Sequence, residues 1–494
     1  EGSKVTVRGI GPDYNLVLFN GRQMPASNLG NGGAGLSGSR SFDFANLASE
    51  SISAVEVYKT SRADNPTGGI GATINVKTLR PLDSEPVVSV GMKAVNDSSN
   101  DNLPRTLQGS DLTGELSGIF SNTYADGRFG VMLSASHQER DSGFNQATVA
   151  EGWATLAGDN TTDWRALPQP GQGYSDRIQN RPGADDIYGR PQNTAYNVNG
   201  VQRQRTNGQA TFQWKPADNV TTTLDYTFVE NKVQQQRSEL SVWFNYGPGD
   251  STWTNGPVAA PIIYSEDMAF SDLSMGGAQL ATKNTMDSLG FNVEWEVNDA
   301  LDLSFDYHTS SAESQPDSPY GSAGVLGVAA YVRGTTTVDY SGDLPIINVQ
   351  LPPGVTQVEA SDALVTGSVF QNSYNKSEVE QFQAKGRFRF ADYSALDFGI
   401  GSTEVDNRSA SAIEQRNTWG GLGTPADYAD DIWYADDMAK YFKAFSGSGD
   451  PRLTGRFLVF DFERLRDQAA QVGTASDPAC PTCYLMPTEY SEDI

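Results

Sequence analysis

One hairpin pattern recurs three times in this sequence, and it restricts the fold more than any other feature. In the first copy, Phe212 and Trp214 alternate with polar residues, a short turn follows, and Leu224 resumes the alternation. The other copies cover residues 289–307 and 382–400. Alternation with period two predicts β-strands that have one apolar face and one polar face. The chain is therefore predicted to be mainly β.

Long polar insertions separate these hairpins, although the turns within them are short. A soluble β-sandwich also alternates, but insertions of about 40 to 70 residues between its hairpins are unusual. A transmembrane antiparallel β-barrel explains the asymmetry, because it has short turns on one rim and long loops on the other. Its polar lumen would be lined by Glu294, Glu296, Asp302, Asp306, Lys385, Arg387 and Arg389.

The strand count predicts an incomplete barrel. Nine strands are expected near residues 87–95, 111–121, 128–138, 204–214, 220–230, 285–297, 300–309, 377–390 and 394–405. Single-chain bacterial barrels have an even number of strands, so C-terminal strands are expected to be missing. The long segments are predicted to be loops on one side, at about 139–203, 231–284, 310–376 and 406–494.

Composition excludes two classes of protein. No run of about 18 apolar residues occurs, which excludes transmembrane helices. There are 35 Lys and Arg residues against 61 Asp and Glu residues, and the net charge of −26 would repel nucleic acid. The cysteines Cys480 and Cys483 are expected to form a small loop disulfide in an oxidising compartment.

Motifs for chemistry are scarce. The glycine stretches at 30–35 and 68–71 do not lead from a strand into a helix, so neither predicts a phosphate or dinucleotide site. His137 and His308 are the only histidines, and both are expected near the outer rim. The aspartates of residues 427–437 lack the spacing of a calcium-binding loop. No cofactor, metal or enzymatic activity is predicted.

The first 82 residues resemble the plug domain of TonB-dependent outer-membrane receptors, particularly the Xanthomonas-, Caulobacter- and Alteromonas-type subgroup. The resemblance rests on four ordered motifs: "VTVRG" at 5–9, "LVLFNGR" at 16–22, "AVEVYK" at 54–59 and "GGIGATINVKT" at 68–78. Lys59 departs from the family pattern, which has an arginine there.

The resemblance implies a small α+β plug domain at residues 1–82, inside a barrel of which residues 83–494 form the N-terminal part. The family barrel has 22 strands, and a lumen of that width needs a plug. The resemblance also implies an outer-membrane location, lipid and lipopolysaccharide contacts, and coupling to TonB through a segment expected to precede residue 1.

Three sets of site residues follow from this interpretation. The plug apices that would touch substrate are Asp13, Tyr14, Met24, Asn28, Asn31 and Arg40. The loop aromatics that would contribute to binding are Trp153, Trp164, Trp243, Trp253, Trp419 and Trp433. A lock between plug and barrel is expected to involve Arg8 with Glu294 and Glu296.

Active import of a scarce nutrient, most simply an oligosaccharide, is the function that these observations favour. A ferric siderophore is the alternative ligand. A secreted β-rich carbohydrate-active enzyme and a passive porin are the other classes considered. The enzyme would need a catalytic carboxylate pair, and the plug motifs argue against the porin.

Overall fold

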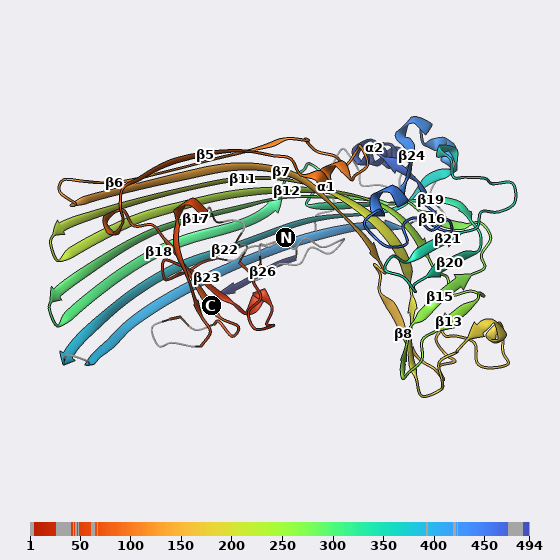
Figure 1. Cartoon of the computed structure of the whole chain (residues 1–494), viewed down its shortest axis with the longest axis horizontal. Helices are drawn as coiled ribbons and strands as arrows, with labels where there is room; N and C mark the ends of the chain where they lie inside the picture. The colour runs from red at the N-terminus through yellow and green to blue at the C-terminus, as the bar shows by residue number, and fades with distance from the viewer. Residues whose placement is uncertain are drawn as a thin grey trace.

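Two sheets and an outer region make up the structure (Figure 1). The computed structural model describes residues 4–25, 41–42, 44, 47, 49–60, 65–66, 68–391, 394–417, 421, 423–472 and 488–493. Its two α-helices are α1 (Ser98–Asp101) and α2 (Phe462–Val472). Short 3₁₀ turns occur at Pro12–Tyr14, Ser49–Ser51, Pro81–Asp83, Ser175–Arg177, Ala360–Asp362, Pro425–Asp427, Asp430–Ile432 and Met438–Phe442. None of the helices in these ranges is both long and apolar enough to cross a bilayer.

The N-terminal sheet has four strands in the order β2-β1-β4-β3. Their bounds are β1 (Leu16–Phe19), β2 (Arg22–Gln23), β3 (Ile52–Tyr58) and β4 (Thr73–Thr78). Asn20 and Gly21 join β1 to β2 with φ angles of 55° and 82°. An Asn-Gly pair with two positive φ angles is the usual two-residue hairpin turn, so the local sequence accounts for this connection.

The large sheet has twelve strands and is predominantly antiparallel. Its strands are β5 (Val87–Val95), β6 (Thr113–Tyr124), β7 (Phe129–Thr148), β11 (Asn193–Ala217), β12 (Val220–Trp243), β16 (Ser271–Ser274), β17 (Gly277–Asn298), β18 (Leu301–Pro316), β19 (Ala323–Arg333), β22 (Ala363–Ala391), β23 (Ser394–Asn417) and β26 (Thr488–Asp493). All nine predicted strands are present, which confirms the mainly β fold. The predicted open tail is wrong in part, because β23 continues to Asn417 and the short polar β26 pairs with it.

The two faces of the large sheet have opposite character, as the alternation predicts. Large apolar side chains on one face are exposed: Val88, Val90, Met92, Leu133, Phe212, Trp214, Leu224, Tyr226, Leu289, Phe291, Phe305, Tyr307, Phe382 and Phe398. On the other face, polar side chains are buried: Gln209, Thr211, Gln213, Thr223, Asp225, Thr227, Ser288, Asn292, Ser310 and Gln381. An apolar outside with a buried polar inside is the arrangement of a barrel wall in lipid.

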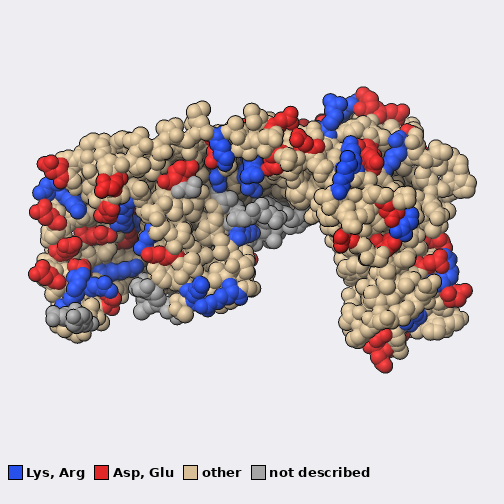
Figure 2. All heavy atoms as spheres, in the orientation of Figure 1, with Lys and Arg blue, Asp and Glu red and all other residues tan. Residues whose placement is uncertain are grey.

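Strand register joins the exposed apolar side chains into a continuous band. Phe212, Leu224, Phe291, Tyr307 and Phe382 stand opposite one another on β11, β12, β17, β18 and β22. Figure 2 shows Lys, Arg, Asp and Glu at the end of the sheet that carries the short turns, over the middle of the molecule and over the outer region. The band therefore runs across the strands, as a lipid-facing belt must.

The outer region lies at the opposite end of the long strands from the short turns (Figure 1). We call two small sheets there the lobe: β8 (Trp153–Ala157), β10 (Ile187–Pro191) and β14 (Val258–Ala259), and β9 (Ile178–Gln179), β13 (Ser251–Trp253), β15 (Pro261–Glu266), β20 (Thr336–Asp339) and β21 (Ile346–Val349). A hairpin, β24 (Trp433–Asp437) with β25 (Arg456–Phe460), accompanies them. All share one apolar core.

Part of this region covers the sheet on the same face as the apolar band. We call residues 96–111, 344–358 and 423–472 the outer cover. Gly143 and Gly200 are cross-strand partners on that face, and a Cβ at either would come within 3 Å of Leu103 or Leu107. The two glycines thus leave space for the cover to approach the backbone.

The prediction that residues 139–203, 231–284, 310–376 and 406–494 are loops is wrong in part. The long strands run well into each segment, and the lobe strands fill much of the remainder. In residues 193–200 of β11, for example, side chains on both faces are buried, so the apolar alternation that marks a lipid-facing strand is absent.

Candidate functional site

Arg22 of β2 joins the N-terminal sheet to the polar face of the large sheet. Its Nη1 lies 2.7 Å from Asp225 Oδ1 of β12, and its Nε lies 2.9 Å from Asp306 Oδ1 of β18. Each carboxylate receives two hydrogen bonds from the guanidinium. The Arg22 side chain is 2% exposed. Two carboxylates and one forked cation form a geometrically specific contact.

The surroundings of Arg22 fix its position. A Cβ at Gly290 of β17 would lie 1.8 Å from Arg22 Nη1, so only glycine admits the guanidinium here. Asn292 Nδ2 donates to Asp306 Oδ2 at 3.1 Å. Burial disfavours the charged guanidinium, but the hydrogen bonds and charges of Asp306 and Asp225 raise the pKa of Arg22 above its ordinary value. Arg22 is therefore charged at any physiological pH.

Further polar contacts surround this ion pair. Gln23 N donates to Gln381 Oε1 at 3.2 Å, and Gln383 Nε2 donates to the Gly21 carbonyl at 3.3 Å. Near the short turn between β11 and β12, Leu82 N donates to Gln213 Oε1 at 2.8 Å. These bonds satisfy polar groups that the interface removes from water, and they set the register of one sheet on the other.

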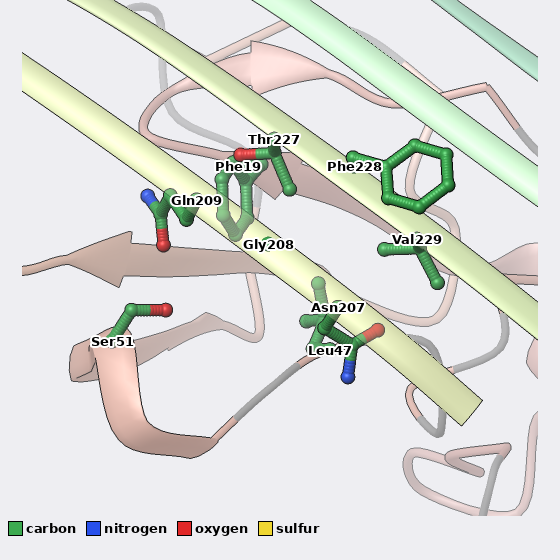
Figure 3. Close-up of a pocket in the computed structure, with 9 residues that line it drawn as sticks. All are labelled: Phe19, Leu47, Ser51, Asn207, Gly208, Gln209, Thr227, Phe228 and Val229. Carbon is green, nitrogen blue, oxygen red and sulfur yellow. The ribbon is translucent and has the colours of Figure 1, made fainter. Parts of the chain in front are cut away.

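An apolar patch lies beside the polar contacts. Val17, Phe19, Met24, Phe42 and Val76 of the N-terminal region pack on residues of the wall, which are Val229, Met286 and Ala312. A cavity nearby, of about 10 Å³, lies between the two sheets and has room for one water molecule. Figure 3 shows it between the N-terminal region and strands β11 and β12; Phe19, Gln209 and Thr227 are among the residues that line it. The sheets are tightly packed at this point.

The structure assigns other partners to the residues predicted for the lock. Arg80 Nη1 lies 3.0 Å from Glu294 Oε1, in an exposed ion pair. Arg8 is exposed in a turn with a φ of 55°, and no ion pair between Arg8 and Glu294 or Glu296 occurs among the described residues. His308 is not at the outer rim as expected: it is fully buried in β18, with Nε2 3.1 Å from Ser288 Oγ.

The predicted substrate contacts on the plug have mixed environments. Asp13 and Tyr14 are exposed, and Asp13 Oδ1 accepts a hydrogen bond from Ser41 N. Met24 is buried in the apolar patch, where packing already occupies its side chain. Asn28, Asn31 and Arg40 lie outside the described residues. A substrate role for these residues remains a prediction.

The predicted loop tryptophans also divide into two groups. Trp253 and Trp433 are buried in the apolar core of the outer region, and Trp243 ends β12 in a half-buried position. Trp153 and Trp164 are exposed. Trp419 and the cysteines Cys480 and Cys483 lie outside the described residues. Within the described part of the chain, no cluster of potential metal ligands occurs.

Comparison with known families bears on the N-terminal sheet. Residues 1–73 match the TonB-dependent Receptor Plug Domain. Arg22 thus lies in the region that matches the plug domain, and it contacts the large sheet. No curated protein matches the sequence.

Solved structures that are similar to this chain include a transporter and two receptors. They include the outer membrane transporter YddB from Escherichia coli, with 12% identity over 84% of this chain and 48% of that chain and a TM-score of 0.33. The ferric preacinetobactin receptor BauA from Acinetobacter baumannii has 11% identity over 83% and 56%, with a TM-score of 0.23. The ferric enterobactin receptor PfeA from Pseudomonas aeruginosa has 10% identity over 87% and 64%, with a TM-score of 0.29. The chain thus spans less than two thirds of each.

Sequence reasoning missed the Arg22 contact, although a signal for it was present. Arg22 closes the "LVLFNGR" motif, and both Asp225 and Asp306 fall on faces otherwise rich in Thr, Ser, Gln and Asn. Two acidic residues on the same polar face, on strands separated by β17, indicate a buried cation partner. The sequence does not reveal which plug cation reaches them.

Proposed function

We propose that this chain is part of a TonB-dependent transporter that imports a scarce nutrient across the outer membrane of a Gram-negative bacterium. One observation carries the proposal: Arg22 fastens a plug domain to the polar face of a sheet whose other face is apolar. A wide barrel in lipid needs such a plug to block its lumen. The proposal is a transporter rather than an enzyme, and it rests on the plug-domain match.

Passage of a substrate then requires the plug to move relative to the wall. The Arg22 ion pairs and the apolar patch oppose that movement, so work must be supplied from outside the barrel. TonB is the proposed partner for this step. The energetic demand is concentrated at one contact, because removing Arg22 from Asp225 and Asp306 leaves two buried carboxylates without their cation.

An oligosaccharide is the substrate that we propose, and a ferric siderophore is the second candidate. The exposed tryptophans of the lobe support the first, since a flat aromatic ring suits a sugar ring. The second is favoured by the similarity to BauA and PfeA, which are receptors for ferric preacinetobactin and ferric enterobactin.

A disulfide between plug and wall tests the transport proposal. Gln23 and Gln381 are hydrogen-bonded across the interface, so the pair Gln23→Cys and Gln381→Cys should cross-link plug to wall. The matched control joins two wall strands through Gln381→Cys and Thr403→Cys, which are cross-strand partners. Uptake of labelled maltohexaose, xylohexaose and ferric enterobactin is measured in cells with and without TonB.

The proposal expects uptake of one ligand class to depend on TonB. The plug-to-wall disulfide should abolish that uptake until a reductant is added, while the wall-to-wall disulfide leaves it unchanged. Uptake that needs no TonB, or that continues through the cross-linked plug, would contradict the proposal.

A further inference from the structure

The inner face of the wall carries basic side chains outside the contacts with the plug. We call four of them the arginine patch: Arg140 of β7, Arg203 and Arg205 of β11, and Arg237 of β12. Alternation and strand register place all four on the face that carries Asp225, which is the face that meets the plug. Along β11, the patch lies between Gln209, which lines the cavity beside the plug, and residues 193–200, which are buried on both faces.

Strand register sets two of these cations directly opposite each other. Arg203 and Arg140 are cross-strand partners, and Arg205 follows on the same face of β11. Side chains in directly opposite positions are about 5 Å apart at Cβ, where like charges destabilise a sheet. Natural proteins accept a cost of this kind chiefly at functional sites.

Arg203 is the member of the patch whose charge is least compensated. Its side chain is half-buried, its Nε has no hydrogen-bond partner, and it forms no ion pair with any described residue. The other cations differ in this respect. Arg140 Nη2 lies 2.9 Å from Asp97 Oδ2, and Arg237 Nη2 lies 3.6 Å from Glu239 Oε2.

A chain of polar contacts extends the patch toward β5. Arg205 Nη2 donates to Gln138 Oε1 at 2.8 Å, and Gln138 Nε2 donates to Glu115 Oε2 at 3.2 Å. The same Glu115 oxygen lies 3.2 Å from Lys93 Nζ. Lys93 and the four arginines therefore outnumber the three described carboxylates beside them. This local excess of positive charge occurs in a chain whose net charge is −26.

An exposed aromatic ring lies on the same face. Phe144 of β7 is 43% exposed, and its cross-strand partner on β11 is Asn199. The partner of Asn199 on β12 is Arg237, so Phe144 and Arg237 lie in one row across the strands. Arg140 and Arg203 lie in a parallel row four residues away, a distance of about 13 Å. A ligand that reaches from one row to the other would meet cations at both ends and an apolar ring.

We propose that the arginine patch binds anionic groups of the imported ligand, and that in the proposed oligosaccharide these groups are the carboxylates of uronate residues. A guanidinium fork matches a carboxylate with two parallel hydrogen bonds, and Arg203 has no carboxylate partner that competes. An anion bound between Arg203 and Arg140 would also offset their mutual repulsion. Phe144 offers a contact to the apolar face of a sugar ring. The inference rests on the proposed function and adds the charge of the ligand.

Isothermal titration calorimetry on the purified receptor tests the inference without TonB. The probes are an alginate hexamer, neutral laminarihexaose and ferric enterobactin. The alginate hexamer should bind at least about 10-fold more tightly than laminarihexaose, and its affinity should fall as the salt concentration rises. Arg203→Gln should weaken alginate binding at least about 10-fold, whereas Arg203→Lys, which keeps the charge, should weaken it only a few-fold. The control Arg128→Gln removes an exposed cation paired with Asp218 near the short turns, and it should leave the affinity unchanged.

Thermal unfolding of the same variants separates binding from a role in the fold. Arg203→Gln removes a cation opposite Arg140, so the unfolding temperature should stay the same or rise. A marked fall would overturn the inference, because Arg203 would then serve the fold. The inference is also overturned if laminarihexaose binds as tightly as the alginate hexamer, or if Arg203→Gln binds the anionic probes as wild type does.

Two further outcomes identify the source of the anion and the status of the transport proposal. Ferric enterobactin binding with the same dependence on Arg203, in place of alginate binding, would support the anion site and assign its ligand to a ferric chelate. Alginate binding that depends on Arg203, in a receptor whose uptake ignores TonB, would support the site and contradict only the transport proposal.

Discussion

Two leucines in the two halves of one strand show how the surroundings decide the structural role of the same type of side chain. Leu224 and Leu240 lie on the same face of β12, sixteen residues apart. Leu224 is 44% exposed and belongs to the apolar band, while Leu240 is fully buried beneath the outer cover. We call the half of the sheet near the short turns the lower half and the half beneath the outer cover the upper half. The lower half thus presents its apolar face to lipid, and the upper half presents the same face to protein.

The two halves also differ in what they contact. In the lower half, polar residues of the wall meet the plug, and the Arg22 ion pair joins the two. In the upper half, Tyr196, Val198, Leu240 and Val242 pack in the apolar core that includes lobe residues. The lower half therefore holds the plug, and the upper half holds the outer region.

Loss of the Arg22 cation should have the largest effect. Arg22→Ala leaves Asp225 and Asp306 buried and unpaired, and breaking such a pair costs about 3–5 kcal/mol. Arg80→Ala, the control, breaks an exposed pair with Glu294 and should cost at most about 1 kcal/mol. Guanidinium unfolding of the plug in the detergent-solubilised receptor measures both. Equal effects would show that Arg22 is not the principal contact.

Truncation of the two leucines of β12 tests the comparison directly. Leu240→Ala creates a cavity in a protein core, and we expect a loss of about 2–5 kcal/mol. Leu224→Ala exchanges side-chain contact for lipid contact and should cost about 1 kcal/mol or less. Thermal unfolding in lipid vesicles compares the two variants. A larger loss for Leu224→Ala would reverse the assignment of the two halves.

A charge introduced on the apolar band should show whether lipid or water covers the band. Leu224→Arg places a cation where the bilayer is expected, at a cost of about 2–4 kcal/mol near the midplane. At Val258, an exposed lobe residue, the change Val258→Arg should cost about 0.5 kcal/mol or less. Reversible unfolding from lipid vesicles measures both. If the two positions tolerate arginine equally, the band is not in lipid.

The smallest expected effect is a local response to acid in the lobe. The bonds from Arg165 lower the pKa of Asp163 to about 2, from an ordinary value of about 3.9. A lowered pKa means that the Asp163 contribution is present above about pH 4 and is lost as pH falls toward 2. The fluorescence of Trp164, taken as the difference between wild type and Trp164→Phe, should change in that interval. Asp163→Asn should remove the change, and a persistent change would exclude this pair as its source.

The lower half of the wall was predictable from sequence because strands that face lipid alternate strictly between apolar and polar residues. The assignment of Gln209, Thr211 and Gln213 to one face and of Phe212 and Trp214 to the other is confirmed by their burial and exposure. The N-terminal motifs likewise indicated a plug domain, which the family match to residues 1–73 supports. Local alternation and motif order sufficed for both.

The upper half of the sheet and the Arg22 contact could not be predicted from the sequence, for two different reasons. In residues 193–200 of β11, both faces are buried, so no alternation marks the strand. Arg22 meets carboxylates more than 200 residues away in sequence, and alternation gives a face without giving a partner. Contacts between a plug and a wall depend on how the two bodies dock, which strand patterns do not encode.

The short hairpin that carries Arg22 has a mechanical consequence. β2 is paired with β1 at only two positions, Leu18 with Gln23 and Phe19 with Arg22, while β1 is paired with β4 at four. A pull on the rest of the N-terminal sheet could open the β1–β2 pairs while Arg22 stays bound to the wall. Residues 20 and 21 would then span at most about 10 Å between the end of β1 and the anchored Arg22. A displaced plug would remain attached to the wall through Arg22, and this attachment would guide its return to the original position.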